Sequence, residues 1–296
     1  MNALIEQYLA YLAGVRNLSG RTVESYRRDL QLFDNFFEGT PLSADSARIK
    51  LFTAHLAENG YAASSINRIL AAVRGFFRFA VRFGHAAENP ALTVTNLKTG
   101  KPLPDFLFDS EMRILCDLPG NLDILWPARD TALFLVLYST GCRVSELAGL
   151  CLKDIESGST AALVMGKGGK ERRVFFSPLA KKALSEYLVE RSTRLASQKG
   201  VDRTKGRVFV SARLAALSVR GIQYILSRYS GPAGTGRPVS PHAVRHSFAT
   251  ALVSRGADIR IVQELLGHSN VSTTQRYTHI TGEQIKEIYH RSHPHG

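Results

Sequence analysis

The chain has 296 residues with ordinary shares of apolar (44%) and charged (21%) side chains, so it is long enough to form two globular domains. A total of 38 Lys and Arg against 25 Asp and Glu gives a net charge of +13, which favours a polyanionic partner such as a nucleic acid. Three Cys residues without a CxxC pair exclude a disulfide framework, and the lack of a signal-peptide pattern or a long apolar run predicts a cytoplasmic protein without a membrane partner.

Residues 1–88 are predicted to form a helical domain. In "SGRTVESYRRDLQLFDNFF" four apolar residues recur at i, i+4, i+7 and i+11 and so share one helix face: Tyr26, Leu30, Phe33 and Phe37. A second helix is predicted over residues 64–84, with an apolar face made of Ile66, Ile69, Leu70, Val73, Phe77, Ala80 and Val81.

The second predicted helix also carries a basic stripe. Arg74, Arg78 and Arg82 recur every four residues, and no acidic partners lie nearby in the sequence. Like charges at this spacing repel one another on a helix, which favours a role in binding a DNA phosphate backbone. A solvated basic face is the alternative interpretation.

A proline-rich stretch separates the two parts of the chain. Pro90, Gly100, Pro102 and Pro104 break any helix there, so residues 89–107 are predicted to be a linker. Most of the positive charge follows it: residues 1–88 carry 10 Lys and Arg against 8 Asp and Glu, and the remainder carries 28 against 17. The predicted division is therefore 1–88, the linker 89–107, a second domain 108–282 and a tail 283–296.

The second domain mixes helices with one predicted hairpin. Helices are predicted over residues 129–141, 177–191, 240–256 and 258–267, several of them with Ser or Pro at the start and Gly at the end. The stretch "TAALVMGKGGKERRVFFS" predicts two strands around Lys167 to Lys170, where the Gly pair supplies the positive φ of a tight turn.

Several residues of this domain could carry chemistry. Arg143 and Glu146 stand at i, i+3 at a helix start, which taken alone is an ordinary surface ion pair. Lys167 lies at the tip of the predicted hairpin, where it is either solvated or directed into a groove. His242 and Arg245 share the first turns of a helix, an end that favours anions.

Two histidines and a tyrosine are further candidates for chemistry. His246 follows His242 at i+4, but an HxxxH pair without Glu is a weak zinc signal, so no metal is expected. Tyr277 stands in the polar, hydroxyl-rich stretch "SNVSTTQRYTH", which predicts a presented tyrosine rather than a core aromatic. With His268, these groups supply what metal-free phosphoryl transfer on a phosphodiester requires: cationic clamps, a proton donor and a nucleophile.

The motifs "TGCRVSEL", "GKGGKER", "HAVRHSFAT", "LLGHSNVSTTQRYTH" and "YHRSHPHG", together with "LSGRTVESYRRDL" near the start, follow one another in a recognisable order. The chain resembles a tyrosine recombinase of the phage integrase family, of the bacterial Xer type, over nearly its whole length. The resemblance implies a mainly α fold with a small β-sheet, in which a helical SAM-like core-binding domain and a catalytic domain form a C-shaped clamp on DNA. It also assigns six catalytic residues and one supporting acid, Glu146; the six are Arg143, Lys167, His242, Arg245, His268 and the nucleophile Tyr277.

The resemblance further implies a function and partners. It predicts a site-specific recombinase that exchanges DNA strands through a 3′-phosphotyrosyl intermediate, without a cofactor, and that resolves chromosome or plasmid dimers at cell division. Its partners would be double-stranded DNA and three further subunits, in a homo- or hetero-tetramer on two DNA sites. The resemblance also suggests two protein partners, a second related recombinase and a septal DNA translocase. The alternatives are a mobile-element integrase of the same family and, from another class, a non-catalytic DNA-binding regulator.

The tail 283–296 includes "EQIKEIYH", whose small apolar face consists of Ile285, Ile288 and Tyr289. The resemblance implies a C-terminal helix that docks on a neighbouring protomer. A helix at the end of a chain can equally pack in cis, and the sequence leaves both alternatives open.

Overall fold

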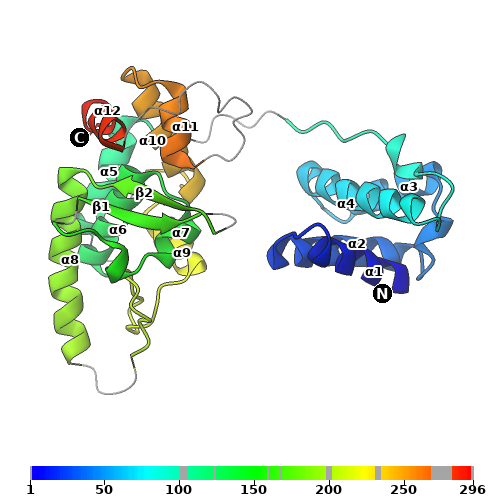
Figure 1. Ribbon diagram of the computed structural model, residues 1–296, viewed down its shortest axis with the longest axis horizontal. Coiled ribbons are helices and arrows are strands. Elements are labelled where there is room, and N and C mark those ends of the chain that lie inside the picture. Colours follow the sequence, from blue (N-terminus) through cyan, green and yellow to red (C-terminus); the bar gives the residue numbers. More distant parts are fainter. Residues whose placement is uncertain are drawn as a thin grey trace. The chain divides into compact units, whose positions relative to one another are not determined.

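The architecture is that of a computed structural model, which describes residues 2–100, 106–122, 125–158, 160–166, 169–197, 202–230, 235–267 and 282–294. The described chain is mainly helical with one small sheet, as expected from the sequence (Figure 1). It divides after Pro102 into two compact units, each with its own hydrophobic core. Among the helices of these described ranges, none has the length and hydrophobicity needed to cross a membrane.

The N-terminal unit contains the helices α1 (Ala3–Gly14), α2 (Gly20–Phe36), α3 (Ser46–Glu58) and α4 (Ala63–Arg82), with the short 3-10 turns η1 (Pro41–Ser43) and η2 (Pro90–Leu92). Helix α4 packs against the other three helices and against η2, so it is the centre of this unit. The predicted apolar faces are buried as expected, including Leu30, Phe33 and Phe37, whereas Val81 is 37% exposed.

The first part of the stretch predicted to be a linker lies against the N-terminal unit. Ala91 and Val94 are buried in its core. Arg74 holds this segment through all three guanidinium nitrogens: Nε donates to the carbonyl oxygen of Ala91 (3.1 Å), Nη1 to Oδ1 of Asn96 (2.9 Å) and Nη2 to the carbonyl oxygen of Val94. Residues 89–96 are therefore fixed to α4 rather than extended as a free connection.

The C-terminal unit surrounds one buried helix, α6 (Pro127–Thr140). Nearly all its side chains from Arg129 onward are buried, and it packs against α5 (Asp109–Asn121), α8 (Pro178–Ala196) and α10 (Pro241–Ser254). The unit also contains α7 (Val144–Gly149), η3 (Leu152–Asp154), α9 (Val219–Tyr229), α11 (Ile259–Leu266) and α12 (Gly282–Ser292). A helix buried on all sides holds its neighbours in fixed positions. Among the candidate catalytic residues, Arg143 caps α7, and His242 and Arg245 lie on α10.

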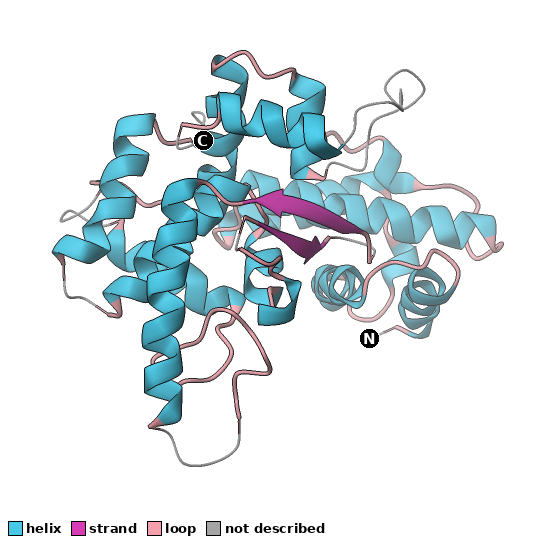
Figure 2. Cartoon of the chain, turned by 60° about the vertical axis from the view of Figure 1, so that its left-hand side comes forward, coloured by secondary structure: helices cyan, strands magenta, loops and turns pink. Residues whose placement is uncertain are grey.

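The predicted hairpin is present (Figure 2). Strands β1 (Ala161–Met165) and β2 (Glu171–Phe175) pair antiparallel, with Ala161 opposite Phe175 and Met165 opposite Glu171. Gly169, in the connection, has a φ of 74°, the positive value for which glycine was expected there. Because side chains alternate along a strand, Arg172 shares a face with the buried Val174, and the exposed Arg173 lies on the other face.

Helix α12 packs in cis, which is one of the two alternatives for the tail. Tyr289 is 1% exposed, with its ring 5.6 Å from that of Phe175 on β2 and 6.5 Å from that of Phe248 on α10. Ile285 and Ile288 pack against the same core. In the single chain, the C-terminal helix therefore completes the hydrophobic core of its own unit.

Candidate active site

The turn from α6 to α7 presents the first candidate arginine. Helix α6 ends at Gly141, whose φ of 55° is left-handed and whose Cα is close to the ring of Phe248: a Cβ there would lie 2.3 Å from a ring carbon. Glycine is required on both counts. Two residues later Arg143 is the N-cap residue of α7, so the turn sets the direction of its side chain.

Glu146 is the buried counter-charge of the site. Its side chain is 1% exposed, and its Oε1 accepts from Nη1 of Arg143 at 2.8 Å. Its Oε2 accepts from the backbone N–H of Arg143 at 2.8 Å and from Nη2 of Arg172 on β2 at 2.7 Å. Burial by itself raises the pKa of this carboxyl, but Arg172 and Arg143 outweigh burial, so the pKa of Glu146 is lowered from its ordinary value.

Arg245 comes from α10 and is 8% exposed. Its Nη1 donates to the carbonyl oxygen of Gly141 and its Nη2 to that of Leu266, both at 2.6 Å. Burial, followed by the positive charges of Arg143 and Arg172, lowers the pKa of Arg245 to about 10. The guanidinium therefore stays protonated at neutral pH, in a place where an added anion would be strongly favoured.

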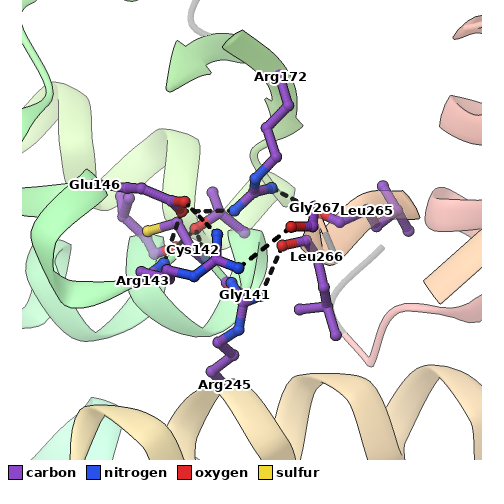
Figure 3. A network of polar contacts seen from close by, with 11 residues as sticks. Gly141, Cys142, Arg143, Glu146, Arg172, Arg245, Leu265, Leu266 and Gly267 are labelled. Atoms are coloured by element: carbon purple, nitrogen blue, oxygen red, sulfur yellow. Dashed lines mark hydrogen bonds and ion pairs between the residues drawn. The ribbon is translucent and has the colours of Figure 1, made fainter. Parts of the chain in front are cut away.

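The C-terminal end of α11 closes the site. Three consecutive carbonyl oxygens accept from three guanidiniums: that of Leu265 from Arg172, that of Leu266 from Arg245 and that of Gly267 from Arg143 (3.2 Å) (Figure 3). The last carbonyls of a helix lack partners within it and carry its negative partial charge, so cations bind there favourably. Gly267 ends the helix in the left-handed region, with a φ of 66°.

The structure thus brings together three of the residues predicted from the sequence, Arg143, Glu146 and Arg245. His242 is exposed in the first turn of α10, where the side chain of Ser240 caps the helix as predicted. Lys167, His268 and Tyr277 lie outside the described residues. The residues directly before Lys167 and His268 in the sequence do lie at the cluster. Gly267 belongs to it, and a Cβ on Gly166 would lie 3.6 Å from Oε1 of Glu146.

Sequence reasoning missed Arg172, the second side chain that holds Glu146. Its partners Glu146 and Leu265 are 26 and 93 residues away in the sequence, and no local spacing reveals such contacts. The strand alternation offered a signal, because Arg172 stands two residues before the buried Val174 and so had to point inward.

The three arginines of the predicted DNA-binding stripe on α4 differ in their surroundings. Arg74 bonds within the N-terminal unit, as described above, and its contact with DNA stays a prediction. Arg78 and Arg82 are exposed and line a hollow of about 230 Å³ with Arg16 and two tyrosines from α1. Nη1 of Arg82 donates to the hydroxyl of one of them, Tyr11, at 3.1 Å.

Comparison with known proteins places this geometry in a family. Residues 118–284 match the phage integrase family, and residues 5–84 match the phage integrase N-terminal SAM-like domain. The chain therefore belongs to the phage integrase family, the tyrosine recombinases, a family of enzymes that cleave and rejoin DNA.

Two relatives are similar over almost the full chain. One is the tyrosine recombinase XerC of Treponema denticola, with 47% identity and 100% of both chains covered. Another is the tyrosine recombinase XerD of Corynebacterium glutamicum, with 37% identity over 98% of both chains. The fold is also similar to that of one chain in the crystal structure of a lambda integrase dimer bound to a COC′ core site. The TM-score is 0.70, and the identity is 18% over 94% of this chain and 98% of that chain. The family and Xer type inferred from the sequence motifs are confirmed.

Proposed function

We propose that this protein recombines DNA at specific sites and resolves chromosome or plasmid dimers in the cytoplasm of a dividing cell. The observation that carries the proposal is the convergence of Arg143 and Arg245 on the C-terminal end of α11, beside the buried carboxylate of Glu146, in a chain 47% identical over its full length to a XerC recombinase. The DNA substrate is a duplex, and the working assembly is a tetramer on two sites. A second related recombinase and a septal DNA translocase are its further partners.

In the proposed reaction, Arg143 and Arg245 bind the non-bridging oxygens of the scissile phosphate, where negative charge grows in the transition state. The hydroxyl of Tyr277 gives its proton to a nearby base as its oxygen attacks the phosphorus, and the bond from phosphorus to the 5′-oxygen breaks. Lys167 donates a proton to that oxygen, and His242 and His268 hydrogen-bond the phosphate. The 5′-hydroxyl of another strand then attacks the phosphotyrosyl bond and releases Tyr277, so the number of phosphodiester bonds is conserved.

Two features of the described chain support these roles. The guanidiniums of Arg143 and Arg245 have fixed orientations, because backbone carbonyls and Glu146 already hold them, and such preorganised charges stabilise a transition state without reorganising. The exposed Arg78 and Arg82 are proposed to bind phosphates of the DNA backbone through the N-terminal unit.

Covalent trapping tests the function. The protein is incubated in EDTA with a labelled duplex that is nicked next to the scissile phosphate, so that the freed end diffuses away and the adduct accumulates. Denaturing gels and peptide mapping are expected to find DNA on Tyr277, and Tyr277→Phe is expected to bind the same DNA without forming the adduct.

A pool of genomic fragments in the same experiment identifies the target. Adducts at one chromosomal site support dimer resolution, and adducts at the ends of a mobile element support the alternative integrase function. Tight DNA binding without any adduct, also in the presence of cell extract, would contradict the proposal that the protein is a recombinase and would favour a non-catalytic DNA-binding regulator.

A further inference from the structure

Arg172 binds two elements of the candidate active site at once. Its side chain is 12% exposed; Nη2 donates to Oε2 of Glu146 on α7 at 2.7 Å, and Nη1 donates to the carbonyl oxygen of Leu265 at the end of α11. A planar guanidinium can hold two acceptors in fixed directions, which a lysine cannot do. Arg172 therefore ties the β-hairpin, α7 and α11 together at one point (Figure 3).

The two bonded elements carry different parts of the site. Glu146 orients the guanidinium of Arg143 through its other oxygen, Oε1. Leu265 lies three residues before His268, at the start of the segment that also includes Tyr277. The contact between Arg172 and α11 is close, since a Cβ on Gly267 would lie 2.7 Å from Cδ of Arg172.

We propose that Arg172 is a positioning residue for DNA cleavage. It holds Arg143, through Glu146, in a fixed position relative to the end of α11, from which the chain continues to His268 and Tyr277. This rests on the proposed function. Arg172 acts on the reaction through the two partners that its Nη atoms hold, Glu146 and the carbonyl oxygen of Leu265. Loss of such a support displaces catalytic groups by a fraction of an ångström to an ångström, which is enough to slow a reaction strongly.

The test compares Arg172→Gln with Arg173→Gln. Arg173 is the adjacent residue of the same strand, but it points outward, is 43% exposed and pairs with Glu156. Single-turnover adduct formation on the nicked duplex is measured together with DNA affinity and thermal unfolding. We expect Arg172→Gln to form the adduct about 100-fold more slowly while binding DNA within about threefold of the wild type, and Arg173→Gln to match the wild type.

A pH profile separates positioning from a merely structural role. The groups that face Glu146 are Arg143 at the start of α7, Arg172 on β2, and Cys142 and Arg245 behind them. Removal of Arg172 takes away one of the two cations that keep Glu146 ionised. The rate of adduct formation by the Arg172→Gln variant should therefore fall on acidification at pH values where the wild-type rate does not depend on pH. Adding Arg172→Gln to Glu146→Gln should slow the reaction less than Arg172→Gln slows the wild type, because the two changes share one support, and of the two hydrogen bonds described for Arg172 only that with Leu265 is left to lose.

Arg172→Lys keeps the proposal testable if the glutamine variant fails to fold. Lysine retains the charge but reaches only one of the two acceptors, so we expect a rate between those of the wild type and Arg172→Gln. A folded Arg172→Lys or Arg172→Gln protein with the wild-type rate and pH profile overturns the proposal. If the wild-type protein itself forms no adduct, it is the proposed function that fails.

Discussion

The carboxylate of Glu146 neutralises part of the positive charge of the site. It is a single buried anion among the guanidiniums of Arg143, Arg172 and Arg245, so the cluster retains a net positive charge that a phosphate can neutralise. The pair of Arg143 and Glu146 was predictable, because i, i+3 spacing at a helix start is a local pattern. Its burial was not, because that depends on β2 and α11.

Glu146→Gln should lower the free energy of unfolding at pH 7 by about 2–3 kcal/mol, since it leaves buried guanidiniums without their counter-charge. The folded-state pKa of Glu146 is lowered, so the stability that the wild type gains from ionisation is present above the ordinary glutamate pKa of about 4.3 and is lost as the pH falls through the folded-state value. Urea unfolding at several pH values measures the difference between the two proteins. A difference that stays constant into acid would contradict the ion-pair account.

At the scale of elements, periodicity predicted helices where apolar residues are well separated from polar ones. Helices α2 and α4 and the hairpin are the clearest cases. Helices α5 and α9 were not predicted. Helix α5 contains Pro119 and Gly120 near its end, so its local signal is weak. Helix α9 has a clear apolar face and a serine N-cap, so periodicity could have predicted it; the buried residues of that face are Ile222, Ile225, Leu226 and Tyr229.

Helix α12 supports the elements that carry two of the site arginines. Tyr289→Ala should remove ring contacts with Phe175 on β2 and Phe248 on α10 and lower the free energy of unfolding by about 3 kcal/mol. Glu287→Ala, at an exposed position of the same helix, is the matched control and should change stability by less than about 0.5 kcal/mol. Equal stability of the two variants, by denaturant unfolding, would mean that α12 does not pack in cis in solution.

At the scale of the whole molecule, the two cores are formed by separate stretches of sequence. One core draws on residues 4–94 and the other on residues 107–289. We propose the domain division 1–88, 89–107, 108–282 and 283–296 on sequence grounds, with one amendment from the contacts of Arg74: residues 89–96 fold with the first domain. A proline-rich composition indicated a linker but could not reveal that Ala91 and Val94 are buried.

A fragment of residues 1–100 is expected to fold alone as a helical domain with cooperative unfolding, because its core is closed within the fragment. A fragment of residues 1–88 lacks Ala91, Val94 and the acceptors of Arg74, and it should be less stable by about 2–3 kcal/mol. Circular dichroism during urea titration measures both. Identical midpoints would show that the segment after residue 88 contributes no stability.

The three carbonyl oxygens at the end of α11 belong to the backbone, so they are present whatever side chains occupy positions 265 and 266. Point substitutions along this edge therefore leave the acceptors in place. An insertion or deletion of one residue in α11 is different, since it turns the helix end by about 100° and removes all three acceptors together. This edge of the site should tolerate changes of side chain in evolving relatives far better than changes of chain length.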